Sequence, residues 1–218
     1  MSEPLVVLPD QDLSTMVFEH LLSLAQPLFE EADARRAAME TPGALMDWQS
    51  QVRSTLIETM GGLPERTPLN ARTAGRTEHP GYVVERLLFE SRPYFYVSAS
   101  LYLPADRDEP GPAVLIPCGH DPQGKAEPDV QRLAQSLAKS GFVVLAMDPL
   151  GQGERSQYWD YSTQSSRIGL GRPEHELAGP QSQLAGLSLA SYSVWDGIRA
   201  LDALCLRDEV DSTRIGCV

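Results

Sequence analysis

The sequence predicts an α/β fold, in which an antiparallel hairpin is followed by parallel strands with flanking helices. Residues 82–103 alternate apolar and polar side chains with a period of two, interrupted at Ser91-Arg92-Pro93, as expected of a hairpin. Two short, continuously apolar segments follow, residues 113–118 and 142–147. Such segments, joined by a crossover helix, are typical of parallel strands buried on both faces.

Residues 11–62 are expected to form two helices that precede the sheet. The second is expected to begin at Thr41-Pro42, a cap residue followed by proline, and to end at Gly61-Gly62. Trp48 is expected to pack in a core. The apolar faces of the two helices are Leu13, Met16, Val17, Leu21 and Leu24 in the first, and Leu45, Trp48, Val52, Leu56 and Met60 in the second.

Residues 63–80 are rich in proline, arginine and threonine and are expected to be a connector. The predicted organisation is therefore a helical extension with its connector over residues 1–78, and a sheet domain over residues 79–218.

Within the sheet domain, the spacing of apolar residues 130–138 predicts the crossover helix, closed by Gly141. Residues 154–182 are expected to form a long loop, and a closing strand is expected to begin near Arg214. The last helix is expected to turn these side chains inward: Leu184, Leu187, Val194, Trp195, Ile198, Leu201 and Cys205.

Composition excludes several function classes. A formal net charge of -12 argues against a nucleic-acid partner, because phosphate binding needs basic patches. No apolar run approaches the roughly 20 residues needed to cross a bilayer, and the N-terminus has no basic segment typical of a secretory signal. Cys118, Cys205 and Cys217 form no disulfide or metal pattern, so reduced thiols and a cytoplasmic location are expected.

The chemistry is expected in two loops that directly follow buried strands, residues 119–125 and 148–155. The first matches the G-x-x-x-x-G-K pattern of a phosphate-binding loop, so an NTPase is one alternative. Against it, Ala126 stands where a hydroxyl should bind Mg²⁺, and a chain whose single asparagine is Asn70 cannot contain the N-K-x-D element for guanine.

Two serines match parts of other catalytic motifs. Gly186-Leu187-Ser188-Leu189-Ala190 is close to a nucleophile elbow, but an elbow requires a strand before the serine. Residues 179–183 are expected to be a loop, and Ser188 is expected to be a helix residue. Ser136 and Lys139 match S-x-x-K without the other elements of that enzyme class.

The order of motifs resembles the amino-terminal half of an α/β-hydrolase, nearest to the acetyl xylan esterase and dienelactone-hydrolase-like enzymes. The resemblance covers roughly residues 40–218. Its motifs are Pro117-Cys118-Gly119-His120 with Gly124-Lys125, Asp148-Pro149-Leu150-Gly151-Gln152-Gly153-Glu154-Arg155, Trp195-Asp196 through Arg199-Ala200-Leu201-Asp202, and Asp211-Ser212-Thr213-Arg214-Ile215-Gly216.

The resemblance implies an incomplete α/β-hydrolase sheet and a carboxylic-ester hydrolase whose nucleophile, acid and base all follow Val218, so that this chain alone is inactive. None of the four histidines occupies the family's catalytic position. The resemblance implies that Gly119 and His120 form half of an oxyanion hole, and it implies no metal or organic cofactor. A peptidase or dienelactone hydrolase, and a non-catalytic binding protein, are the alternatives on this fold.

The remaining residues of the strand-end loops are interpreted as architecture or pocket lining. Asp148 is expected to accept hydrogen bonds from the turn that it opens, while Gly151 and Gly153 permit positive φ. Arg155 is expected to pair with a neighbour or to line the pocket. The aromatic residues of the long loop, Tyr158, Trp159 and Tyr161, could form an apolar wall or anchor that loop.

Overall fold

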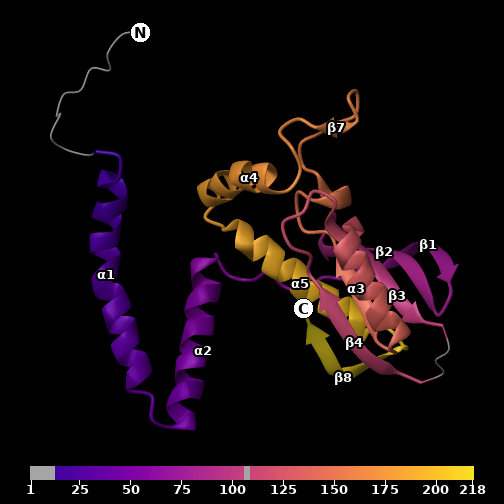
Figure 1. Ribbon diagram of the computed structural model, residues 1–218, viewed down its shortest axis with the longest axis horizontal. Helices are drawn as coiled ribbons and strands as arrows, with labels where there is room; N and C mark the ends of the chain where they lie inside the picture. The colour runs from indigo at the N-terminus through magenta and orange to yellow at the C-terminus, as the bar shows by residue number, and fades with distance from the viewer. Residues whose placement is uncertain (1–12, 106–108) are drawn as a thin grey trace. The chain divides into compact units, whose positions relative to one another are not determined.

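The computed structural model describes residues 13–105 and 109–218 (Figure 1). The first residues of the predicted helical extension, 1–12, and the N-terminal segment tested for a secretory signal lie outside the described residues. The chain divides into two compact units, one ending at Thr55 and the other beginning at Leu56. None of the described helices is long and apolar enough to cross a membrane.

The first unit contains α1 (Met16–Ala37) and most of α2 (Pro42–Thr59). Thr41 caps α2 as expected, because its Oγ1 accepts a hydrogen bond from the Ala44 N–H at 3.2 Å. Neither helix contains a fully buried residue. Trp48 is half-buried and lines a small hollow within this unit with Leu28 and Val52.

The second unit is built on a six-stranded sheet in the order β1-β2-β3-β5-β4-β8. Its strands are β1 (Arg72–His79), β2 (Tyr82–Arg92), β3 (Phe95–Pro104), β4 (Gly111–Ile116), β5 (Val143–Met147) and β8 (Val210–Cys217). The hairpin of β2 and β3 is antiparallel, and β4 pairs in parallel with both β5 and β8. The predicted α/β class, with a hairpin followed by parallel strands, is confirmed.

The expected connector over residues 63–80 is wrong in part, because β1 lies inside it and pairs with β2. All residues of β1 except Gly75 are exposed, so its sequence shows no alternation of buried and exposed residues. The domain boundary after residue 78 stays a prediction.

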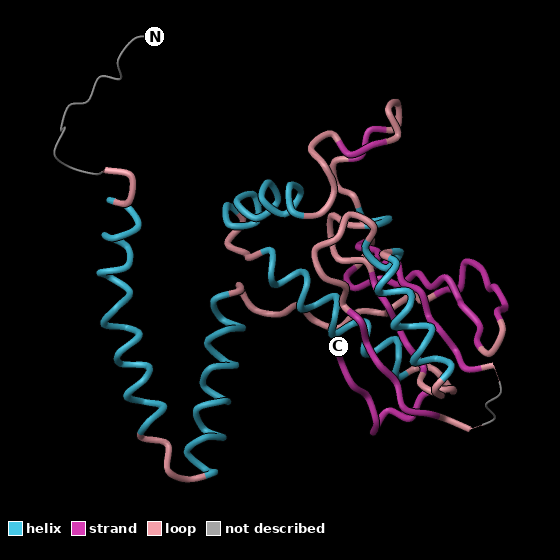
Figure 2. Tube along the Cα trace, in the orientation of Figure 1, coloured by secondary structure: helices cyan, strands magenta, loops and turns pink. Residues whose placement is uncertain are grey.

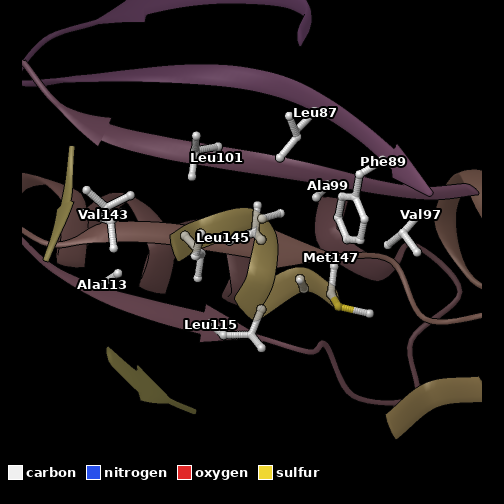
Figure 3. Close-up of a cluster of buried hydrophobic side chains, with 14 of the residues drawn as sticks. Leu87, Phe89, Val97, Ala99, Leu101, Ala113, Leu115, Val143, Leu145 and Met147 are labelled. Carbon is white, nitrogen blue, oxygen red and sulfur yellow. The ribbon is translucent and has the colours of Figure 1, made fainter. Parts of the chain in front are cut away.

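Two helices cover the two faces of the sheet. On one face, α3 (Pro128–Lys139) buries Ala134 and Ala138 with Tyr102 and Val144. On the other, α5 (Leu189–Cys205) packs Ala200 and Leu204 on the larger core cluster. Figure 3 shows strand side chains of this cluster, which include Leu87, Phe89, Val97, Ala99, Leu101, Ala113, Leu115, Val143, Leu145 and Met147.

The long loop expected over residues 154–182 is also wrong in part. It contains the 3-10 turn η2 (Gly153–Arg155), the short strands β6 (Trp159–Asp160) and β7 (Ser165–Ser166), and most of α4 (Arg172–Leu184). Figure 2 shows α4 as a helix where Gly179-Pro180 had indicated a loop. The pattern misled because proline and glycine are helix breakers, yet Pro180 lies inside α4.

The inward face expected for the last helix is only partly correct. Trp195 is buried, but Leu184 is 91% exposed and belongs to α4, and Val194 and Cys205 are exposed. The helix begins only at Leu189, and its buried stripe carries polar side chains that apolar periodicity does not mark. The buried residues of α5 are Ser191, Trp195, Asp196, Arg199, Ala200, Ala203 and Leu204.

The closing strand β8 begins four residues before the predicted Arg214, and its pairing with β4 is shifted between Gly111 and Ala113. Beyond the shift, Ile215 lies opposite Ala113, and Cys217 opposite Leu115. The Val218 N–H then donates to the Leu115 carbonyl at 3.1 Å. The chain after β8 therefore emerges beside the chain that leaves β4.

Candidate active site at the carboxyl ends of the parallel strands

Two loops meet at the carboxyl edge of the parallel strands: residues 117–123 after β4 and residues 148–156 after β5. This is the edge at which open α/β sheets bind ligands. Gly119 and His120 are exposed there, and a Cβ atom built on Gly119 would meet nothing within 4 Å. Within the described chain, the backbone N–H groups of Gly119 and His120 donate to no other residue. Two amides are thus free to meet a ligand.

Asp148 joins the two loops. Its carboxylate is fully buried and accepts four hydrogen bonds. The donors are Ser98 Oγ at 2.8 Å, the Lys125 N–H at 2.8 Å, the Glu154 N–H at 3.1 Å, and the Lys125 ammonium. The side chain therefore ties β3, the β4 loop and the β5 loop to one point.

Two glycines make room for this carboxylate. A Cβ atom on Gly124 or on Gly153 would lie 2.3 Å from Asp148 Oδ1. Both residues also have positive φ, +55° and +54°, which disfavours any side chain. Gly151 has positive φ as well, and its Cβ position lies 3.0 Å from Glu174 Cβ.

Lys125 is committed to carboxylates. Its side chain is 11% exposed, and the ammonium pairs with Asp148 and, at 2.6 Å, with Glu154. A phosphate would have to displace both acids, so the geometry does not support the phosphate-binding match.

Gln152 holds the β4 loop in place through two hydrogen bonds. It is 1% exposed, and its Nε2 donates to the carbonyls of Gly119 at 2.6 Å and Asp121 at 2.9 Å. Because the Gly119 carbonyl is held, the peptide that bears the His120 N–H has a fixed orientation. Sequence reasoning missed this role, since the two residues are 33 positions apart.

His120 and His175 form a second link that the sequence did not reveal. His120 Nε2 lies 2.8 Å from His175 Nδ1, and His175 Nε2 contacts the Leu150 carbonyl. A carbonyl only accepts, so His175 Nε2 carries a proton. When the His175 ring is neutral, its Nδ1 therefore accepts the hydrogen bond that His120 Nε2 donates. His175 is on α4, so this helix contacts the oxyanion candidate directly.

Glu174, the residue before His175, fastens α4 to the β5 loop. It is 1% exposed and accepts from the Gln157 N–H at 2.7 Å and from Ser166 Oγ at 2.8 Å. Ser156 Oγ also donates to it. The segment predicted as a loop is therefore anchored by a buried acid.

Arg155 is 5% exposed and lies between β5 and α5. Its Nη1 donates to the Asp148 carbonyl at 3.0 Å, and its Nη2 lies 2.8 Å from Asp196 Oδ2. On the same helix, Trp195 Nε1 donates to the Ser91 carbonyl at 2.7 Å. The ion pair with Asp196 and the hydrogen bond from Trp195 hold α5 against the β5 loop and β2.

The two serine matches have structural roles. Ser188 is not within a helix as expected but is the N-cap of α5, and its Oγ accepts from the Ala190 N–H at 3.2 Å. It follows α4 rather than a strand, so it is not at a nucleophile elbow. Ser136 lies on α3, where its Oγ donates to the Arg132 carbonyl at 2.8 Å.

Two of the three loop aromatics have the anchoring role considered for them. Tyr158 Oη donates to Gln181 Oε1 at 2.8 Å, and Trp159 pairs with Ser166 across the β6–β7 ribbon. Both anchor the segment. Tyr161 is 83% exposed.

Burial raises the pKa of the Cys118 thiol to about 11, and the nearby Asp148 charge adds to this effect. The thiol is therefore protonated at neutral pH and is not a nucleophile there. Among the described residues, no three His, Cys, Asp or Glu side chains are grouped to hold a metal ion.

Solved structures share the fold of this chain. A protein of Bacteroides fragilis NCTC 9343, provisionally named an acetyl xylan esterase, matches 82% of the chain with a TM-score of 0.68 at 20% identity. The chain has the α/β-hydrolase fold. The acetyl xylan esterase of Paenibacillus sp. R4 matches 76% of the chain with a TM-score of 0.50 at 20% identity.

One curated sequence is similar to this chain. YtaP of Bacillus subtilis (strain 168), provisionally named a hydrolase, is 27% identical over 180 residues, which are 78% of this chain. The chain spans about half the length of these relatives, 55% of YtaP, 48% of the Bacteroides protein and 55% of the Paenibacillus esterase. No protein-family model matches the sequence.

Proposed function

We propose that this chain is the amino-terminal part of a carboxylic-ester hydrolase of the acetyl-esterase type, and that Gly119 and His120 supply main-chain donors of its oxyanion hole. The observation that carries the proposal is the pair of free N–H groups at the carboxyl end of β4. They lie next to β8, the strand that in this fold leads to the nucleophile.

The geometry suits stabilisation of a developing negative charge. The Gly119 carbonyl is held by Gln152, and the His120 ring is held by His175, so the peptide between them is oriented before a substrate arrives. Preorganised donors of this kind are worth about 3 to 4 kcal/mol of barrier each. They require no metal or organic cofactor.

The attacking hydroxyl is not among the serines that resemble one. Ser188 caps a helix and Ser136 bonds within a helix. We therefore assign the serine nucleophile, and the acid and histidine that activate it, to residues that follow Val218 in a longer protein.

The three cysteines are unpaired, which supports a cytoplasmic location.

The assay is hydrolysis of p-nitrophenyl acetate by the 218-residue chain and by a longer product of the same gene. The proposal expects background rates from the former, and from the latter turnover that a serine-directed fluorophosphonate abolishes. Turnover by the 218-residue chain that disappears in Ser188→Ala would contradict it. A panel of acetyl esters, lactones and peptides then separates an esterase from a dienelactone hydrolase or a peptidase.

A further inference from the structure

A hollow of about 510 Å³ lies between the β2–β3 hairpin and the loop that follows β5. Leu88, Tyr96 and Ser98 line it from the hairpin, and Leu150 and Gln157 from the loop. Its volume is in the range of small-molecule sites. It is separate from the oxyanion candidate, because β4 and β8 lie beyond β5 in the sheet and neither contributes to its walls.

Arg86 is an exposed residue that lines this hollow and also a smaller one beside Tyr82 and Lys125. In the part of the chain that the structure describes, no carboxylate pairs with its guanidinium. Of the other charged residues on the walls, Arg155 pairs with Asp196, and the exposed Glu154 shares the Lys125 ammonium with Asp148. In a protein with a net charge of -12, an unmatched arginine in a concave site indicates an anionic ligand.

The strand beside Arg86 is shaped to receive its side chain. The pairing of β1 with β2 shifts between Thr73 and Gly75, and Gly75 then lies opposite Arg86. A Cβ atom on Gly75 would be 2.1 Å from Arg86 Nη2. Glycines and bulges in strands mark places where another group approaches closely or a side chain is redirected. The absence of a side chain at Gly75 therefore makes room for the Arg86 guanidinium.

Aromatic residues form another part of the wall of the hollow. Tyr94, Phe95 and Tyr96 follow one another at the hairpin turn and all line it. Tyr94 is 85% exposed and has φ +62°, a strained conformation for a residue with a side chain. Its N–H donates to Glu90 Oε2 at 3.1 Å, which helps to hold that conformation. The exposed ring of Tyr94 is therefore open to contact with a ligand.

We propose that this hollow is a binding site for a small carboxylate carried on a ring. The carboxylate pairs with the Arg86 guanidinium, whose fork matches two oxygens, and the ring lies against the hairpin aromatics. The ring can belong to an aromatic acid or to an acidic sugar. The site does not depend on the esterase proposal.

Titration calorimetry of the 218-residue chain tests this with benzoate and glucuronate as probes, and with acetate, phosphate and benzyl alcohol as comparisons. One ring carboxylate at least is expected to bind, with the neutral and ringless compounds at least about tenfold weaker. Binding of benzoate alone identifies an aromatic acid, and binding of glucuronate alone an acidic sugar.

Two variants test the charge of Arg86 and the position of its guanidinium separately. Arg86→Gln removes the charge, and Gly75→Ala keeps it but displaces the guanidinium; each is expected to weaken binding about tenfold or more. Arg132→Gln removes an exposed arginine on α3 and is expected to change it less than about twofold. The proposal is wrong if no ring carboxylate binds, if phosphate or acetate binds as tightly as the ring carboxylates, or if the three variants have the same affinity. Circular dichroism verifies that each variant is folded.

Discussion

Replacing Asp148 by asparagine tests how strongly the two strand-end loops depend on one carboxylate. Asparagine has the same size but offers one acceptor oxygen and an amide that donates. Its better orientation keeps oxygen at the position of Oδ2, toward Ser98, Glu154 and the Lys125 ammonium. The amide then faces the Lys125 N–H, donor against donor, and the ammonium loses its buried countercharge.

Breaking a buried ion pair on one side costs about 3 to 5 kcal/mol. The denaturant slope for small proteins is about 1 to 3 kcal/mol per M urea, so the unfolding midpoint should fall by about 2 M. Urea titration of the 218-residue chain, followed by tryptophan fluorescence, measures this shift. The matched control is Glu154→Gln, which removes the exposed partner of the same ammonium and should cost less than about 1 kcal/mol. Equal small effects for both variants would refute the central role of Asp148.

Further outcomes follow from the same contacts. Gly153→Ala should destabilise the protein by more than about 2 kcal/mol in the same titration, because the new Cβ would meet Asp148 and φ at this position is positive. Gly119→Ala, which has open space around it, should cost under about 1 kcal/mol. Similar losses for the two variants would contradict this packing. Iodoacetamide at pH 8 should label the exposed cysteines but not Cys118, as peptide mass spectrometry can show. Since the folded pKa of Cys118 lies above that of the unfolded thiol, its contribution to stability should be complete below pH 9 and be lost as pH rises toward 11; a rise in stability over that range would oppose the assignment. Ser188→Ala should cost about 1 kcal/mol through the lost helix cap and leave esterase turnover of the longer protein unchanged, while a large loss of turnover would make Ser188 catalytic.

Within the sheet domain, the sequence predicted the elements whose side chains are buried in a regular pattern. The apolar run of β5 is buried throughout, and the alternation of β3 matches its two faces. The polar strand β1 gave no such signal, and Gly179-Pro180 hid α4. In each missed element, pairing or anchoring by distant residues outweighs the local preference of the chain.

The sequence pointed to candidate site residues only where these directly follow a buried strand. Gly119, His120 and Asp148 stand at strand ends, so position alone drew attention to them. The roles of Gln152 and His175 depend on contacts between residues 33 and 55 positions apart. Arg86 and Gly75 meet because of a register shift between strands. No local pattern contains this information, because it arises only when the sheet is assembled.

The most direct test of the oxyanion assignment compares two changes at one position in the longer protein. His120→Pro removes the backbone N–H, while His120→Ala keeps it and removes only the ring. The assignment predicts that proline lowers kcat for p-nitrophenyl acetate about 100-fold or more, with alanine at least about tenfold less harmful, in variants whose thermal unfolding is similar. Equal losses from the two substitutions would show that the His120 amide does not stabilise the transition state.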